Sequence, residues 1–473
     1  MLASGILLRS GTMTKLWVFL QLMFLIKVAA STEGSCETGR LHALFPNFGR
    51  CYSIVCNNVS QNSIHPFCSP AAVFIMSYRR SDSLEIEAGA FEEFSNLREL
   101  YMEDSSVENM EPGAFNGLVN LKRLSLSKNK LAHLRKGIFN SLTTLSYLDM
   151  SNNFIQSFEK DTFLGMKDLK TLGLENNRIK NIEQILNVRN NLTVLRLQYN
   201  DISDLTSLHK FEHLEDLNLA NNLITELPEG VFGSTDLKLL MLSSNLIRNI
   251  NENAFMILIN LKTLDLSSNT LLVRIPVGLF RNNKNLQILN LSGSGLETIS
   301  IGTFTGLHSL KDLYLSFNRL TYLPKGVFDD LKLTSLHING NSLTYLDYGG
   351  DLSTTMPIAI NLNDNPWRCD VLANIIRTLE GANIIRGYTT KTSNIYGITC
   401  SEHQYEKILK RRELEEEIEE DYNKIRKLAA IEYSKMSAEI KSDVMSIKNE
   451  FLNTFQGYFN YIQNNRRYNC SVI

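Results

Sequence analysis

The stretch that decides the fold is LKRLSLSKNKL, residues 121–131. Its pattern, L-x-x-L-x-L-x-x-N-x-L, returns at residues 145–155 and recurs from Leu97 to Leu333 at spacings of 22 to 25 residues. With two weaker copies that begin at Val73 and Pro357, the chain contains about 13 units. The ninth position is Asn in most units, and a Phe follows most starts by 18 or 19 residues. A period near 24 is the signature of a repeat array and not of a single amphipathic helix.

The spacing has a direct physical interpretation. The last two leucines of L-x-x-L-x-L are two residues apart, so on a strand both point into the core while the residues beside them face out. The Asn amide can bond backbone groups of the turn that would otherwise be buried without partners. The Phe closes the core on the opposite side, and each unit buries its apolar edges only against its neighbours. The pattern therefore predicts an α/β leucine-rich-repeat solenoid over residues 73–365, a horseshoe with a parallel sheet on its concave face.

Composition and motifs exclude several function classes. The chain has 473 residues, 43% of them hydrophobic, and a formal net charge of −2. Apolar content this high excludes a disordered chain, and the absence of basic excess argues against nucleic-acid binding. No phosphate loop, metalloprotease, nucleophile-elbow or dinucleotide motif occurs, so we expect neither an enzyme nor a cofactor. His209 and His213 are four residues apart, but without further ligands we interpret them as surface residues.

The N-terminus has the parts of a secretory signal peptide. Leu16 to Ile26 is an apolar run broken by one glutamine, basic residues precede it, and small residues end near Ala30. The run is too short to span a bilayer comfortably, which disfavours the alternative of a membrane anchor. We therefore expect residues 1–30 to be removed, whether translation starts at Met1 or Met13. No later apolar span occurs, so the sequence predicts a secreted, extracellular protein.

Cysteines flank the repeats. Residues 31–72 form a predicted N-terminal cap with four cysteines, and residues 366–400 form a predicted C-terminal cap with two. In a secreted chain this placement favours disulfides over metal ligation. The four N-terminal cysteines allow three connectivities, and the sequence does not choose among them. The six predicted disulfide cysteines are Cys36, Cys51, Cys56, Cys68, Cys369 and Cys400.

Composition changes after Cys400. Residues 401–473 are predicted to form a long helix or coiled coil with a polar tail, whose apolar stripe advances in steps of three and four. The steps make an 11-residue repeat, which predicts a straight or slightly right-handed bundle with a second copy or another chain. Packing back onto the horseshoe is the other way to bury the stripe. The predicted interface residues are Ile418, Tyr422, Ile425, Tyr433, Met436, Ile440, Val444, Ile447, Phe451, Phe455, Tyr458 and Ile462. Cys470, the seventh cysteine, is a candidate for an inter-chain disulfide, and a free thiol is the alternative.

Exposed strand positions are the candidates for binding. Tyr, Arg and Met are enriched at protein interfaces, and a rigid concave sheet suits protein ligands. The candidate protein-binding residues are Tyr101, Tyr147, Arg196, Tyr199, Met241, Tyr314, Phe317 and His337. Sequons for N-linked glycosylation occur at Asn58, Asn191, Asn290 and Asn469. A glycan at Asn290, an outward strand position, would block the middle of the concave face.

The order of these parts resembles the secreted leucine-rich-repeat immune proteins of insects. A signal peptide, repeats of about 24 residues, cysteine-bearing caps, and a helical stripe with an extra cysteine follow one another as in that family. The resemblance implies disulfide-linked dimers that hold a complement-like thioester protein, or recognition of a pathogen surface. The first hypothesis is therefore a secreted innate-immune recognition or scaffolding factor that oligomerises through its C-terminal helix, with itself or another chain. The second is an extracellular-matrix or adhesion module, or a soluble receptor-like protein.

Overall fold

The computed structural model describes residues 35–40, 51–57, 73, 75–79, 85–183, 185, 191–329, 331–346, 357–379, 383–385, 394–401 and 424. The chain divides into two compact units, Met1–Glu402 and His403–Ile473. All described residues except Lys424 belong to the first unit, so the fold below is the fold of that unit.

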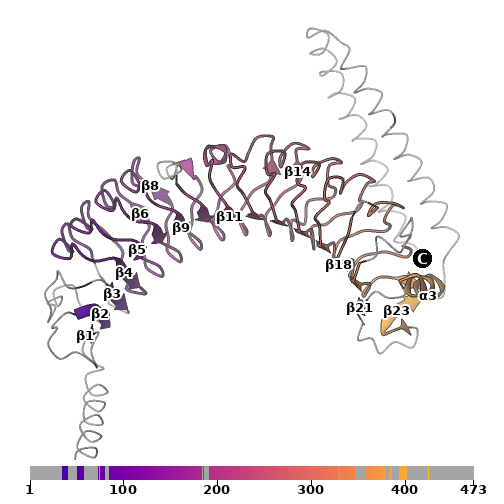
Figure 1. Cartoon of the computed structure of the whole chain (residues 1–473), viewed down its shortest axis with the longest axis horizontal. Helices are drawn as coiled ribbons and strands as arrows, with labels where there is room; N and C mark the ends of the chain where they lie inside the picture. Colours follow the sequence, from indigo (N-terminus) through magenta and orange to yellow (C-terminus); the bar gives the residue numbers. More distant parts are fainter. Residues whose placement is uncertain are drawn as a thin grey trace, which may run out of the picture. The chain divides into compact units, whose positions relative to one another are not determined.

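A sixteen-stranded sheet runs through the first unit. Each predicted repeat supplies one strand, and these strands pair in parallel with their neighbours along the inner side of the arc in Figure 1. The predicted leucine-rich-repeat solenoid with a parallel concave sheet is thereby confirmed. The repeat strands are β3 (Ile75–Arg79), β4 (Glu99–Glu103), β5 (Arg123–Ser125), β7 (Tyr147–Asp149), β9 (Thr171–Gly173), β10 (Val194–Arg196), β11 (Asp216–Asn218), β13 (Leu239–Met241), β15 (Thr263–Asp265), β16 (Ile288–Asn290), β17 (Asp312–Tyr314), β18 (Ser335–His337) and β19 (Ala359–Asn361).

Strands from both predicted caps extend this sheet beyond the repeats. At the N-terminal end, β1 (Ser35–Arg40) pairs antiparallel with β2 (Cys51–Asn57), and β2 pairs parallel with β3. At the other end, β21 (Asn383–Ile385) pairs with β19. The sheet therefore does not end at the predicted repeat limits of 73 and 365, because an uncovered edge strand would expose unpaired backbone groups. The register sets Cys36 opposite Cys56, but Cys68 lies outside the described residues and the N-terminal disulfides stay a prediction.

The leucines of the pattern form the core. In β7 and β15 the central leucine is fully buried while its two strand neighbours are half-buried on the concave side. Burying one such side chain stabilises the fold by about 1.5–3 kcal/mol. Because the same positions are buried in successive repeats, the apolar core is continuous from Val73 to Cys400.

The asparagine at the ninth position joins each repeat to the one before it. The Asn153 Oδ1 accepts a hydrogen bond from the Leu131 backbone N–H at 3.0 Å. Its Nδ2 donates to the carbonyls of Leu126 and Met150, at 3.0 and 3.1 Å. Buried asparagines at equivalent positions, such as Asn177 and Asn269, make the same set of bonds. The predicted role of this residue is confirmed: it pairs loop groups that water cannot reach.

Phenylalanine rings stack from repeat to repeat on the opposite side of the core. The ring centroids of Phe91, Phe115, Phe139 and Phe163 follow one another at 5.9, 5.9 and 6.1 Å. Phe211 also has the repeat spacing and is buried, although the sequence analysis did not single it out. The sequence expectation that a Phe closes each unit is confirmed for these repeats.

Short elements cover the outer side of the arc. Two small parallel pairs form there, β6 (His133–Leu134) with β8 (Ser157–Phe158) and β12 (Glu226–Leu227) with β14 (Asn249–Ile250). A 3-10 helix, η4 (Leu208–Lys210), lies in a repeat between these two pairs, just before the buried Phe211. These elements replace long helices, which a repeat of about 24 residues has no room to form.

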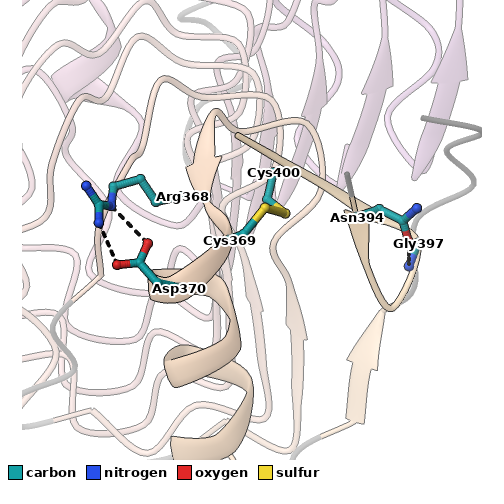
Figure 2. Close-up of a disulfide and its surroundings, with 6 residues drawn as sticks. All are labelled: Arg368, Cys369, Asp370, Asn394, Gly397 and Cys400. Atoms are coloured by element: carbon teal, nitrogen blue, oxygen red, sulfur yellow. Dashed lines mark hydrogen bonds and ion pairs between the residues drawn. A yellow bond between two sulfur atoms is a disulfide. The ribbon is translucent and has the colours of Figure 1, made fainter. Parts of the chain in front are cut away.

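The C-terminal cap closes the core around Trp367. This side chain is fully buried, and its Nε1 donates to the Leu362 carbonyl at 2.6 Å. The cap consists of β20 (Trp367–Arg368), α3 (Cys369–Thr378), β22 (Asn394–Ile395) and β23 (Ile398–Ser401). A disulfide joins Cys369 at the start of α3 to Cys400 in β23, across a sequence separation of 31 (Figure 2). Closing a loop of that length is worth about 4 kcal/mol in the chain-entropy model.

The predicted C-terminal helix lies outside the described residues, except for its first residue and Lys424. Ser401 is not helical: it ends β23, where it pairs with Arg368. The predicted boundary at 401 is therefore wrong by at least one residue, because the cap needs that strand to complete its small sheet. The stripe from Ile418 to Ile462 and the cysteine at Cys470 stay predictions.

Candidate functional site

The candidate site is the concave face, whose side chains stand in two ladders fixed by strand register. The first ladder contains the first residue of each strand that faces the concave side, and the second contains the residue two positions later. From β4 to β18 the first ladder reads Glu99, Arg123, Tyr147, Thr171, Val194, Asp216, Leu239, Thr263, Ile288, Asp312 and Ser335. The second reads Tyr101, Ser125, Asp149, Gly173, Arg196, Asn218, Met241, Asp265, Asn290, Tyr314 and His337.

Aromatic and charged side chains interlock at the N-terminal end of these ladders. The Tyr101 hydroxyl donates to the Glu99 carboxylate at 2.7 Å. The Arg123 guanidinium lies 4.3 Å from the centre of the Tyr147 ring, within the range of a cation–π contact. Burial raises the pKa of both tyrosines, and a neighbouring carboxylate adds to the effect in each case. The register thus brings the predicted residues Tyr101 and Tyr147 together through Arg123.

Arg196 stands among carboxylates in the middle of the face. Burial raises the pKa of Glu175 and of Asp216, and the Arg196 charge opposes both shifts. Among the described residues, Arg196 makes no ion pair within 4.0 Å. Its guanidinium therefore influences these carboxylates at a distance and keeps its donors available to a ligand.

Gly173 leaves a notch between two carboxylates. A Cβ at this position would lie 3.1 Å from Glu175 Oε2 and 3.3 Å from Asp149 Oδ1. The Glu175 Oε2 and the nearby Gln198 Oε1 are both shielded from solvent and accept no hydrogen bond. Leaving a buried acceptor unpaired costs about 1–3 kcal/mol. A hydrogen-bond donor that reached either oxygen would remove this cost.

We name this region the charged patch. The predicted binding residues include three of its members. Asp149 and Asp216 have outward strand positions that could have signalled them, whereas Glu175 lies beyond its strand. The patch consists of Glu99, Tyr101, Arg123, Tyr147, Asp149, Glu175, Arg196, Gln198 and Asp216.

A second group, the aromatic patch of Tyr314, Phe317 and His337, lies on β17 and β18 and the turn between them. The Tyr314 and His337 rings stack at 4.7 Å between centroids with an interplanar angle of 15°. His337 Nε2 lies 2.7 Å from the Ser335 hydroxyl, and burial lowers the pKa of His337. Phe317 is 65% exposed and covers Gly340 of the next repeat. The structure therefore brings these three predicted residues together.

Two of the predicted residues stand in a strained backbone conformation. Tyr199 and Phe317 have φ values of 59° and 56° and occupy the turn position that Asn152, Asn176 and Asn221 hold in other repeats. Bulky residues rarely adopt positive φ, whereas asparagine tolerates it. Tyr199 is also 54% exposed. An aromatic ring that is both strained and exposed indicates a function other than folding.

The other predicted sites are less distinctive. Met241 is half-buried between Asn218 and Asp265 in the second ladder and belongs to neither patch. Both histidines considered as a metal pair are exposed: His209 Nδ1 contacts the Thr206 carbonyl at 2.7 Å, and His213 Nδ1 lies 3.9 Å from Asp236. Within the described part of the chain, no cluster of three His, Cys, Asp or Glu residues could hold a metal. No helix in that part is long and apolar enough to cross a membrane.

Two of the four predicted sequons lie on described residues. Asn191 is exposed, and its Nδ2 donates to the Lys167 carbonyl at 2.5 Å. Asn290 is half-buried on the concave side of β16. Asn58 and Asn469 lie outside the described residues.

Comparisons with known proteins identify the repeats. A family model described as "Leucine rich repeat" matches residues 80–131, 119–179, 212–271, 259–320 and 284–343. A second, described as "Leucine Rich repeats (2 copies)", matches residues 190–230. Together they cover more than half of the chain.

Relatives and solved structures agree on the fold. The chain is 31% identical over 156 residues to human "Leucine-rich repeats and immunoglobulin-like domains protein 1", a match that spans 32% of this chain and 14% of the relative. It is 31% identical over 197 residues to human "Oligodendrocyte-myelin glycoprotein", spanning 41% and 43%. The match therefore covers less than half the length of either relative. The structure of an LRIM1/APL1C complex aligns over 89% of this chain and 82% of that one, with a TM-score of 0.58 and 21% identity. The chain belongs to the leucine-rich-repeat family.

Proposed function

We propose that this chain is a secreted, non-catalytic recognition factor that binds a protein partner through the charged patch. The observation that carries the proposal is the pair of shielded, unpaired acceptors, Glu175 Oε2 and Gln198 Oε1, beside the notch at Gly173. They lie just beyond strands β9 and β10, near an arginine, Arg196, that has no ion pair among the described residues.

The patch offers both halves of a polar recognition surface. A lysine, arginine or amide donor from the partner would pair the acceptors at the notch, and a charge-assisted bond to Glu175 would be the strongest of these. Arg123 and Arg196 would receive partner carboxylates. Tyr101 and Tyr147 supply large, rigid contact area of the kind that dominates interface energetics.

Site-specific photocrosslinking tests this surface. A p-benzoylphenylalanine at Tyr147 in the full-length chain should capture the partner from extracellular fluid. The matched control carries the same group at Ile259, which is 48% exposed near the phenylalanine side of its repeat. Capture from Ile259 but not from Tyr147 would show that the concave patch is not the contact surface.

The biological role proposed for this binding is innate-immune recognition or scaffolding. A complement-like thioester protein or a pathogen surface is the proposed partner, supported by the resemblance of the domain order to insect immune proteins. The alternative is a matrix, adhesion or soluble receptor-like function, supported by the stretch shared with oligodendrocyte-myelin glycoprotein. Mass spectrometry of the Tyr147 crosslink separates the two: a thioester or microbial protein favours the first, and a matrix or cell-surface protein favours the second.

Self- or partner association through the C-terminal stripe is a separate part of the proposal. Its support is the 11-residue apolar repeat in the sequence and the division of the chain after Glu402. Removing residues 403–473 should leave a folded monomer by sedimentation, because the first unit retains its own caps. The full chain with Ile440→Asp and Ile447→Asp should behave the same way, since packed helices would bury unpaired charges. An unchanged oligomer in both variants would rule out the stripe as the interface.

Cys470 is proposed to bridge two chains. Cys470→Ser should remove a dimer band from a non-reducing gel while leaving weaker association at high concentration, because a bridge raises the effective concentration of existing contacts. If the wild-type protein already runs as a monomer without reductant, the bridge does not form.

A further inference from the structure

Of the two described sequon residues, Asn290 is the one that lies in a strand of the concave face. It is the third residue of β16 and stands ninth of the eleven residues of the second ladder, between Asp265 and Tyr314. The leucines on either side of it, Leu289 and Leu291, are fully buried, so the Asn290 side chain projects from the concave face. The other described sequon residue, Asn191, lies outside the strands, three residues before β10 begins at Val194, and its Nδ2 already donates to the Lys167 carbonyl.

The side-chain oxygen of Asn290 accepts a hydrogen bond, whereas its side-chain nitrogen has no hydrogen-bond partner among the described residues. Its Oδ1 accepts a hydrogen bond from the backbone N–H of Ser292 at 3.1 Å, which forms an Asx turn within the Asn290-Leu291-Ser292 sequon. Its Nδ2 makes no hydrogen bond with any described residue and is not among the shielded unpaired atoms. The nitrogen that would carry a glycan is therefore unpaired and not fully shielded from solvent.

We propose that Asn290 carries an N-linked glycan that covers the aromatic end of the concave face and confines protein ligands to the charged patch. The glycan depends on the secretory route of the proposed function. In the transfer, Nδ2 forms a bond to C1 of the first N-acetylglucosamine of a lipid-linked oligosaccharide. The bond from C1 to the lipid diphosphate breaks, and the amide loses one proton.

The distances along the ladder decide what such a glycan covers. Adjacent strands lie about 4.8 Å apart, so Tyr314 is about 5 Å and His337 about 10 Å from Asn290. Tyr101, eight strands away, lies about 38 Å along the sheet, and Tyr147 lies about 29 Å away. A bulky surface glycan on Asn290 would therefore lie over Tyr314 and His337 and leave the N-terminal tyrosines open. The stacked rings of Tyr314 and His337 offer the flat apolar surface on which a sugar ring can rest. The aromatic patch would then pack against the glycan and would not be a second protein-binding site.

The ladder supplies conservative variants for the test. Asp149 and Asp265 stand at the same position as Asn290, and each accepts the equivalent backbone N–H at 2.9 Å. Asn290→Asp should therefore keep the turn and the fold while removing the nitrogen to which the glycan would be attached. Ser292→Ala removes the sequon but keeps Asn290, and Ser292→Thr keeps the sequon.

The experiment is glycopeptide mass spectrometry of the full chain expressed in insect cells, followed by hydroxyl-radical footprinting. We expect Asn290 to be occupied in the wild type and in Ser292→Thr, and unoccupied in the other two variants. Oxidation of Tyr314 should rise several-fold in both unoccupied variants, while oxidation of Tyr101 and Tyr147 should stay the same.

Each contrary outcome overturns a specific claim. Occupancy at Asn191 with an empty Asn290 would reject this glycan while leaving secretion intact. An occupied Asn290 with unchanged Tyr314 oxidation would reject the covering of the aromatic patch. A chain retained in the cytosol with neither site occupied would reject the secretory route, and with it both this inference and the proposed function.

Discussion

The two sides of the repeat strands follow different rules. The core side holds leucine in β5 and β15 alike, followed by the same buried asparagine with the same hydrogen bonds. The concave side changes in every repeat, from Arg123 on β5 to Thr263 on β15. Residues that recur encode the stacking of the repeats, whereas residues that differ encode what the face can bind. Substitutions on the core side should therefore cost stability, and substitutions in the charged patch should cost binding.

The phenylalanine stack gives the largest expected effect. Phe139→Ala removes a fully buried ring that contacts Phe115 and Phe163, and should lower the free energy of unfolding by about 3–5 kcal/mol. Urea denaturation measures the loss. Phe154→Ala, at a ring that is 45% exposed, is the control and should change little. Equal losses in the two variants would contradict the stacked core.

Replacing a buried asparagine at the ninth position of a repeat should give the next largest loss of stability. Asn153→Ala would strand the Leu131 N–H and should cost about 1–3 kcal/mol. The carbonyls of Leu126 and Met150 would each lose one of two amide donors. Asn260→Ala removes an exposed asparagine that bonds only the Thr235 carbonyl, so its cost should stay within about 0.5 kcal/mol. A small loss in Asn153→Ala would mean that water replaces the amide.

Tyr199 should behave in the opposite way from a core residue. Tyr199→Asn places a residue that tolerates positive φ where the tyrosine is strained, and should raise the free energy of unfolding by up to about 1 kcal/mol. Asn176 already occupies the equivalent turn position of the preceding repeat. Thermal unfolding would record the gain, and a destabilised variant would show that the ring contributes to packing.

Replacing Glu175 should change stability least among these variants, and the change should depend on pH. Because burial raises its pKa above the unfolded value, the folded state favours the neutral acid, and ionisation at neutral pH works against folding. Glu175→Gln should therefore raise stability at pH 7, and the gain should vanish as pH falls below the ordinary range of a glutamate. A gain that is equal at pH 7 and in acid would contradict burial as the cause.

The recurring residues could be predicted from the sequence because the same pattern occurs in every repeat. Leu148, Asn153 and Phe139 all lie where the pattern sets them. The cap strand β21 could not be predicted, since Asn383–Ile385 carries no repeat pattern and forms where the sheet needs a last partner.

The candidate site was predictable only in outline. Alternation on a strand identifies Tyr147 and Arg196 as outward, but the contact of the Tyr147 ring with Arg123 depends on the register between repeats. Glu175 and Gln198 lie two residues beyond their strands, where alternation alone does not indicate burial. Tyr199 and Phe317 were predicted as candidates, but their positive φ was not, although the Asn, Ser and Gly residues at the equivalent positions were a signal of it.

The central claim is that the charged patch binds the protein partner, and the most direct measurement is the partner's dissociation constant for two matched arginine variants. Arg196→Ala truncates the arginine at the centre of the patch, and Arg248→Ala truncates an exposed arginine beside β14 on the outer side. We expect Arg196→Ala to raise the dissociation constant at least about tenfold, as for an interface hot spot, and Arg248→Ala to leave it within about twofold. Unchanged binding by Arg196→Ala together with weakened binding by Arg248→Ala would contradict it.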